Sequence, residues 1–304
     1  MISYQKLFDR LNAKNINKSQ LSDILGISSR TIAKFGKGEV VSDIILKKIA
    51  NYLECNVEDL YKEVSPNKLL QLLRDEKEAK IKGGFYHELQ VRMTYNSNHI
   101  EGSKLSEDQT RFIYETSTIE TNGAVPVDDI LETLNHFKAI DYVIDVAEEP
   151  LTEETIKHLH YLLKQNTSDS NISWFAVGDY KKRANSVGGK ETAKPEDVSR
   201  KIQNLLYKYN SRNNISIENI VEFHVDFERI HPFQDGNGRV GRLIALKECL
   251  KNNIVPFIIE DSKKVYYYKG LSSWNTERNF LIETCLDGQD TIKDILTMLD
   301  ISID

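Results

Sequence analysis

Residues 231–242 constrain the fold of this chain more than any other segment. They read His-Pro-Phe-Gln-Asp-Gly-Asn-Gly-Arg-Val-Gly-Arg and separate two stretches in which apolar residues recur at helical spacing. The first predicted helix spans 216–230, and Pro232 disfavours helical geometry at the residue before it. The second predicted helix spans 239–252. The sequence therefore predicts two core helices joined by a loop of charged and small residues.

The residue types of this loop suit the binding of a polyphosphate. Its glycines permit positive φ values that let backbone N–H groups converge on an anion, and the following helix adds the positive end of its dipole. Arg239 and Arg242 lie three positions apart and can both bind phosphate oxygens. Asp235 supplies the hard oxygen that Mg²⁺ prefers, and His231 can act as a general base at neutral pH.

The string resembles the active-site motif of the Fic family. The resemblance of the chain to this family extends over roughly residues 85–290. The resemblance implies a helical fold with a small β-hairpin flap, and transfer of AMP from ATP to a Ser, Thr or Tyr hydroxyl of a target protein. It implies that His231 is the base and that Asp235 is the Mg²⁺ ligand. In the phosphorylating, Doc-like branch of the family, lysine stands at the position that Gly238 occupies in this chain. The implied ATP contacts of the loop are Gly236, Asn237, Gly238, Arg239, Val240, Gly241 and Arg242.

A second motif precedes the loop by more than a hundred residues. Ser97 and Glu101 lie one turn apart on the same face of a helix predicted for about residues 86–102. The string Ser-Asn-His-Ile-Glu-Gly resembles the inhibitory motif of the family. The resemblance implies that Glu101 pairs with Arg242 in place of the terminal phosphate of ATP, and in some members the same glutamate supports removal of AMP. The alternative is a solvated serine and glutamate on an ordinary helix.

Residues 171–190 break the helical pattern and predict a short strand pair. Residues 178–189 resemble the flap hairpin of the family, which pairs with the target segment. Lys181 stands where arginine is common, so the register stays open. The resemblance adds ATP contacts from the flap and from downstream aromatic residues, for which core packing is an equal alternative. These residues are Ser186, Val187, Gly188, Tyr267 and Trp274.

Residues 1–64 predict a separate helical domain. A short helix follows Asn17 and ends at Gly26, and a second short helix follows directly. This layout resembles the Cro/C1-like helix-turn-helix. Ten lysines and arginines against eight aspartates and glutamates in residues 1–63 weakly favour contact with DNA, and a bundle that packs on a partner is the alternative. The expected DNA-binding residues are Ser29, Arg30, Thr31 and Lys34.

The rest of the chain predicts a linker helix in 65–84, after the helix-breaking Ser65-Pro66, and a Fic-like domain in 85–304. A formal net charge of −6 argues against generic binding to nucleic acids or membranes by bulk charge. Three widely separated cysteines suit a reducing cytoplasm, and no signal peptide or membrane-spanning run is recognised. We therefore expect a cytoplasmic protein.

Together these patterns predict a mainly α protein with a helical Fic fold, a small β-hairpin flap and an N-terminal helix-turn-helix bundle. The expected function is a protein adenylyltransferase that uses ATP and Mg²⁺, is restrained by Glu101, and modifies a target protein or itself. Many relatives of this class form dimers, so the resemblance adds a homodimer to the options. One alternative is a DNA-binding transcription regulator whose Fic-like domain senses a nucleotide or a partner. Another is transfer of a different group, such as UMP or phosphocholine.

Overall fold

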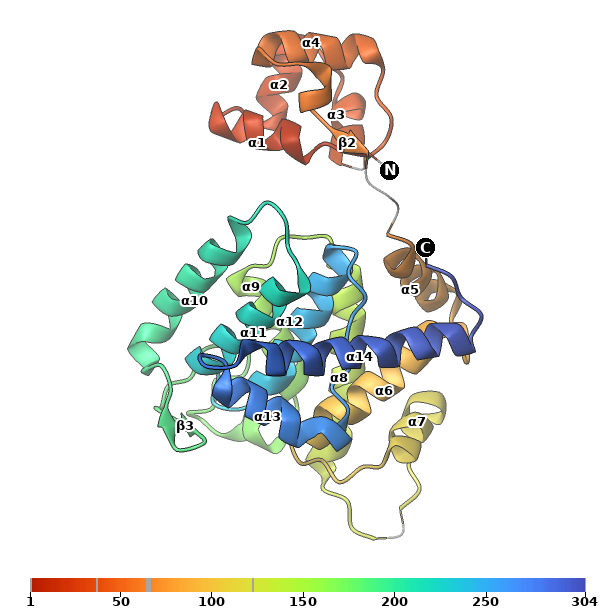
Figure 1. Ribbon diagram of the computed structural model, residues 1–304, viewed down its shortest axis with the longest axis vertical. Helices are drawn as coiled ribbons and strands as arrows, with labels where there is room; N and C mark the ends of the chain where they lie inside the picture. The colour runs from red at the N-terminus through yellow and green to blue at the C-terminus, as the bar shows by residue number, and fades with distance from the viewer. Residues whose placement is uncertain (1, 37, 64–66, 122, 304) are drawn as a thin grey trace. The chain divides into compact units, whose positions relative to one another are not determined.

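The computed structural model describes residues 2–36, 38–63, 67–121 and 123–303 (Figure 1). The chain divides into two compact units, Met1–Asn67 and Lys68–Asp304. Each unit buries its own cluster of hydrophobic side chains. None of the helices within the described ranges is long and apolar enough to cross a membrane.

The N-terminal unit contains the predicted helix-turn-helix. The side chain of Asn17 accepts a hydrogen bond from the Gln20 backbone N–H, the Gln20 side chain accepts one from the Asn17 N–H, and Gly26 ends the helix in the left-handed region. A two-residue antiparallel pair joins the ends of the unit, with Ile2 opposite Glu63. The elements are β1 (Ile2–Ser3), α1 (Gln5–Ala13), α2 (Lys18–Leu25), α3 (Ser29–Gly36), α4 (Asp43–Leu53), a 3₁₀ turn (Val57–Asp59) and β2 (Lys62–Glu63).

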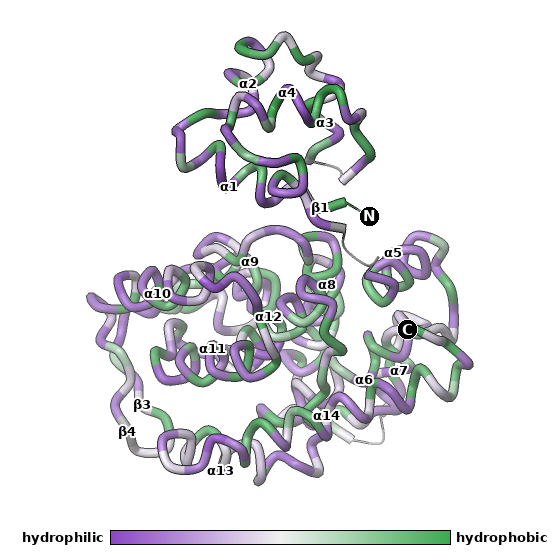
Figure 2. The backbone as a smooth tube through the Cα atoms, turned by 45° about the horizontal axis from the view of Figure 1, so that its top comes forward, coloured by the Kyte–Doolittle hydropathy of each residue, from purple (hydrophilic) through white to green (hydrophobic). Residues whose placement is uncertain are grey.

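The larger unit is helical apart from one short hairpin. Hydrophobic and hydrophilic residues are interspersed along its surface helices (Figure 2), and the buried hydrophobic ones form its main core. Its helices are α5 (Lys68–Ala79), α6 (Phe85–Ile100), α7 (Glu107–Thr116), α8 (Val127–Asp145), α9 (Glu153–Lys164), α10 (Pro195–Asn210), α11 (Ile217–Ile230), α12 (Asn237–Lys251), α13 (Lys264–Ser273) and α14 (Arg278–Met298). The hairpin is β3 (Ser186–Val187) with β4 (Lys190–Glu191), and 3₁₀ turns span Ser168–Asn171 and Asp261–Lys263.

Helix α12 forms the centre of this unit. Nearly all of its residues are buried, which is the pattern of a core helix rather than an amphipathic one. It packs against α6, α8, α9 and α11, and these helices surround it in Figure 1. The charged residues of its first turns are therefore enclosed by four helices.

The helix expected as a linker is part of the larger unit. Leu69, Leu70 and Leu73 of α5 are buried in the main core, where α5 packs on α6 and α8. The prediction was wrong because the many charged residues of this segment made its continuous apolar face hard to recognise in the sequence. Ser65 and Pro66, expected to interrupt the helical pattern, lie outside the described residues.

The strand pair is shorter than the sequence predicted. Residues 171–185 follow an irregular path, and only Ser186–Glu191 forms the hairpin. Phe175, one of the residues that suggested a strand, is buried and stacks on His160. Core packing thus explains an apolar pattern that resembled β structure.

Candidate active site

His231 lies at the junction between α11 and the loop. It is the C-cap of α11 in the left-handed conformation (φ 52°, ψ 63°), which is uncommon for a residue other than glycine. Its Nδ1 lies 3.3 Å from the carbonyl oxygen of Glu228, an arrangement that assigns the ring proton to Nδ1 and the lone pair to Nε2. Burial, reinforced by the charge of Lys181, lowers the pKa of His231 to about 4. The imidazole is therefore neutral at physiological pH and can accept a proton.

The loop is closed by Asn237. The Phe233 N–H donates to Asn237 Oδ1 at 2.8 Å, and Asn237 Nδ2 donates to the Phe233 carbonyl at 2.9 Å. The Phe233 ring is fully buried and stacks on His160, with centroids 4.0 Å apart and planes at 7°. The side chain of Asn237, expected to contact ATP, is thus engaged in bracing the loop.

Helix α12 begins two residues earlier than predicted and starts without a side-chain cap. Gly236 is its N-cap, with φ +79°, and of the loop glycines 236 and 238 it alone adopts a positive φ. The first N–H groups of a helix have no intrahelical partner and carry the positive end of its dipole. The start of α12 therefore has the properties of an anion site.

Asp235 is ionised and partly open to solvent. Its Oδ2 lies 2.7 Å from Lys164 Nζ and 3.2 Å from Arg239 Nη2, and its side chain is 54% exposed. Burial opposes the charge, but Arg239 and Lys164 together hold the pKa of Asp235 well below its usual range. The loop thus presents a carboxylate at neutral pH.

The two arginines of the loop diverge into two separate charge clusters. Arg239 pairs with Asp235 and with Glu132 of α8. Arg242 donates to Glu101 Oε1 at 2.7 Å, to Ser97 Oγ at 3.0 Å and to the Ser97 carbonyl at 2.8 Å. The structure therefore brings together the two segments that the sequence linked by resemblance.

Glu101 lies against the first turn of α12. A Cβ built on Gly238 would overlap Glu101 Oε1 and would lie 3.1 Å from Arg242 Nη1. Glycine at position 238 therefore leaves room for the Glu101 side chain, and it is not needed for a positive φ. The carboxylate of Glu101 occupies the region where an anion bound to the helix start would lie.

Two buried donors of the loop arginines have no protein partner. Among the described contacts, Arg239 Nε and Arg242 Nη1 are shielded from solvent and unpaired. Buried polar groups in native proteins are nearly always hydrogen-bonded, so each such atom requires an explanation. A bound anion would supply acceptors for both.

Comparison with known proteins agrees with this geometry. Residues 150–249 match the Fic/DOC family, and residues 6–65 match the Cro/C1-type helix-turn-helix DNA-binding domain. The chain carries a Fic domain. The larger unit thus has the predicted mainly α fold, and a helix-turn-helix domain precedes it.

Relatives of the Fic domain include enzymes named protein adenylyltransferase Fic. That of Nematostella vectensis is 28% identical over 191 residues, covering 60% of this chain and 42% of the relative. That of Drosophila virilis is 27% identical over 184 residues, covering 60% of this chain and 37% of the relative. The chain thus spans less than half the length of these relatives.

Solved structures share the fold. A Fic-domain signalling protein of Bacteroides thetaiotaomicron has a TM-score of 0.61 at 26% identity, covering 78% of this chain and 96% of that chain. Fic-1 of C. elegans has a TM-score of 0.57 at 19% identity, covering 96% of this chain and 98% of that chain.

Four residues expected to contact ATP are instead core residues of the Fic domain. Tyr267 is 1% exposed and its hydroxyl lies 2.6 Å from His224 Nε2, and Trp274 is 3% exposed. Val240 is fully buried, and the position of a Cβ on Gly241 is covered by His224 and Glu228. The order of aromatic residues in the sequence does not show which side of α13 faces the core, and the ATP contacts expected of these four residues stay predictions.

The hairpin of the Fic domain is attached at its base to the loop between α11 and α12. The Lys181 N–H donates to the Pro232 carbonyl at 2.9 Å, and Asn185 Nδ2 donates to the Phe233 carbonyl at 3.1 Å. Lys181 is buried, and its Nζ donates to Asn185 Oδ1 at 2.7 Å and to Thr192 Oγ1 at 2.6 Å, so it braces the base of the hairpin. Ser186, Val187 and Gly188 lie on the exposed hairpin.

Sequence reasoning missed three charged residues beside the loop. Glu132 of α8 pairs with Arg239, Lys164 of α9 pairs with Asp235, and Asp169 of the following turn pairs with Lys164. They come from separate elements and belong to no local motif, so only the fold brings them together.

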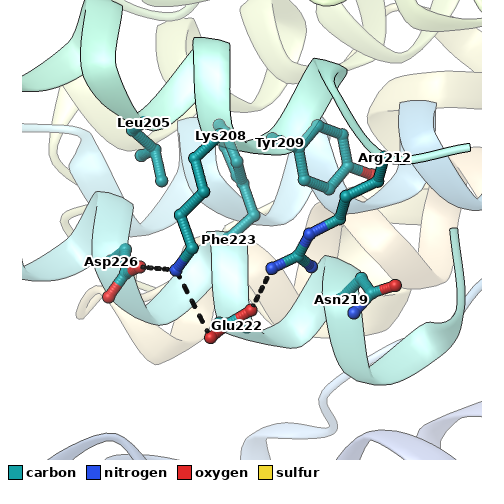
Figure 3. A pocket seen from close by; sticks show the side chains of 8 residues that line it. All are labelled: Leu205, Lys208, Tyr209, Arg212, Asn219, Glu222, Phe223 and Asp226. Carbon is teal, nitrogen blue, oxygen red and sulfur yellow. Dashed lines mark hydrogen bonds and ion pairs between the residues drawn. The ribbon is translucent and has the colours of Figure 1, made fainter.

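A shallow pocket elsewhere in the Fic domain is unrelated to this site. It lies between α10 and α11, where Lys208 faces Glu222 and Asp226, and Arg212 pairs with Glu222 (Figure 3). Its charged groups neutralise one another, and the loop between α11 and α12 contributes no residue to its lining.

In the helix-turn-helix unit, α3 presents the expected residues at its surface. Ser29 and Arg30 are exposed, and Thr31 and Lys34 are half-buried. The Thr31 N–H donates to Ser28 Oγ at 3.2 Å, which caps the start of the helix.

Proposed function

We propose that the Fic domain is a protein adenylyltransferase that transfers AMP from ATP to a Ser, Thr or Tyr hydroxyl of a target protein. The observation that carries the proposal is the juxtaposition of a neutral histidine with an uncapped helix start and two buried arginines that have unpaired donors. The names of the relatives support it.

In the proposed reaction the acceptor hydroxyl oxygen attacks the α-phosphorus of ATP. The bond from that phosphorus to the oxygen bridging the β-phosphate breaks, and pyrophosphate leaves. His231 Nε2 takes the hydroxyl proton, because its ring is neutral at physiological pH. The first N–H groups of α12 and Arg239 hold the phosphates, and Arg242 holds the terminal phosphate.

Asp235 suits a magnesium ion bound mainly by the nucleotide. The described residues contain no cluster of three histidine, cysteine or acidic side chains that could hold a metal alone. Mg²⁺ usually keeps several waters and binds one or two carboxylates plus substrate phosphates, and a half-exposed, ionised aspartate fits that role. When bound, the ion would neutralise charge on the phosphates.

Glu101 acts as a brake in this proposal. Its carboxylate takes the guanidinium needed by the terminal phosphate and lies over Gly238 at the helix start. ATP can bind productively only after this carboxylate leaves, since two anions would otherwise share one site. By orienting a bound water molecule, the same carboxylate could support removal of AMP from the target.

The test uses ATP labelled at either the α- or the γ-phosphate, incubated with the Glu101→Gly variant and a host lysate. We expect transfer of the α-label to a protein, no transfer of the γ-label, and no transfer when His231 is also replaced by alanine. Transfer of the γ-label would instead indicate a kinase-like activity. Labelled UTP and CDP-choline tested in parallel separate AMP transfer from transfer of other groups.

We also propose that the N-terminal unit binds DNA through α3. The exposed Ser29 and Arg30 on a capped helix, in a unit that matches a DNA-binding family, favour this function. Selection from random duplexes followed by footprinting would identify the site, and binding that is lost in Arg30→Ala would support it. The absence of any binding of duplex DNA by this unit at low salt would contradict the proposal.

A further inference from the structure

Four charged side chains form a closed ring at the start of α12. Glu132 lies 2.7 Å from Lys164 Nζ through Oε1 and pairs with Arg239 through Oε2. Asp235 Oδ2 completes the ring, 2.7 Å from Lys164 Nζ and 3.2 Å from Arg239 Nη2. The signs of charge alternate, so every member has two neighbours of opposite charge. Two members belong to the catalytic loop region, and two come from α8 and α9.

The ring is buried everywhere except at Asp235. The side chains of Lys164, Arg239 and Glu132 are 3%, 4% and 15% exposed, whereas that of Asp235 is 54% exposed. Removing charges from water is expensive, and buried ion pairs are often no more stabilising than well-packed apolar residues. Stability alone is therefore a weak reason for this arrangement. The member of the ring that is exposed to solvent is Asp235, whose carboxylate is proposed to bind the metal.

We propose that Glu132 and Lys164 are positioning residues for AMP transfer, an inference that rests on the proposed function. Lys164 fixes the carboxylate of Asp235, and Glu132 fixes the guanidinium of Arg239. Because Glu132 also binds Lys164, the orientations of the two loop residues are coupled. The ring leaves Arg239 Nε as a donor with no described protein partner, available to a phosphate.

The exposed carboxylate of the ring suits a cation that arrives with a nucleotide. Asp169 Oδ2 also lies 2.7 Å from Lys164 Nζ but binds it outside the ring. The ring itself holds two carboxylates and two cations, and the carboxylate most exposed to solvent is that of Asp235. Groups that orient metal ligands typically change metal affinity or activity about 10- to 100-fold when removed.

The experiment compares Glu132→Gln with Asp169→Asn, both in the Glu101→Gly parent. Each change neutralises one carboxylate 2.7 Å from Lys164, but only the first opens the ring. We measure kcat and KM for ATP by transfer of the α-label, binding of manganese and ATP by calorimetry, and the melting temperature. We expect Glu132→Gln to lower kcat about 10- to 100-fold with a smaller change in KM, and Asp169→Asn to resemble the parent in both.

Glu132→Asp guards against a folding defect in the glutamine variant. It keeps the charge that balances Lys164 but shortens the side chain, so it cannot span both cations. We expect it to fold, to bind manganese and ATP, and still to lose kcat. Parental kcat in the aspartate variant, or losses in Asp169→Asn equal to those in Glu132→Gln, would overturn the positioning role. A parent that binds ATP but transfers no label would instead overturn the proposed function.

Discussion

The contact between Glu101 and Arg242 predicts how strongly ATP is excluded. The bond from Arg242 Nη2 to Glu101 Oε1 is 2.7 Å long, with the arginine side chain 4% and the glutamate side chain 30% exposed. A hydrogen bond to a charged group contributes about 1.5–3 kcal/mol. Because Glu101 is partly solvated, the lower half of this range applies. A factor of ten in affinity corresponds to about 1.4 kcal/mol, so Glu101→Gly should tighten ATP binding roughly 10- to 40-fold.

Calorimetry and thermal melting measure this effect without a target protein. Glycine is tolerated at position 101 because Glu101 is the C-cap of α6. We expect the variant without nucleotide to melt lower than wild type, since the buried Arg242 loses its carboxylate, and ATP to raise its melting temperature more than that of wild type. Glu101→Gln, which keeps the size but not the charge, should give an intermediate result. Equal ATP affinity in wild type and Glu101→Gly would refute the reasoning.

Three further outcomes follow from the site. The rate of AMP transfer by the Glu101→Gly variant should stay constant from neutral pH downward and fall only as pH nears about 4. The reason is that the pKa of His231 is lowered to about 4 and its ring accepts protons only while neutral. A pH–rate profile that falls near pH 6.5 would contradict this shift. Gly238→Ala in the Glu101→Gly parent should weaken ATP binding at least tenfold by calorimetry, because its Cβ would occupy the region held by the Glu101 carboxylate; undiminished affinity would place the phosphates elsewhere. Asn237→Ala should lower the free energy of unfolding by about 1–3 kcal/mol in urea titrations, since it removes two hydrogen bonds that close the loop, and an unchanged midpoint would count against that bracing role.

The sequence predicted those parts of the site whose residues are close together in the chain. His231, Asp235 and Arg242 lie in one short loop, where the proline and the glycines also mark the helix boundaries. The meeting of Glu101 with Arg242 was predicted through resemblance alone, since no spacing relates residues so far apart.

The remaining parts depend on tertiary packing. Glu132 and Lys164 reach the loop only because α8 and α9 pack against α12. The side chains of Tyr267 and Trp274 point into the core, which neighbouring residues in the sequence do not reveal. Gly238 has helical geometry, and its role became clear only from the position of Glu101 above it.

The central claim is that His231 drives transfer of AMP from a nucleotide held at the start of α12. Mass spectrometry of proteins incubated with ATP and the Glu101→Gly variant tests it most directly. The account predicts a Ser, Thr or Tyr residue that has gained one adenylyl group, and no such product when His231 is also replaced by alanine. A product carrying a single phosphate, or an adenylyl product that persists without His231, would contradict it.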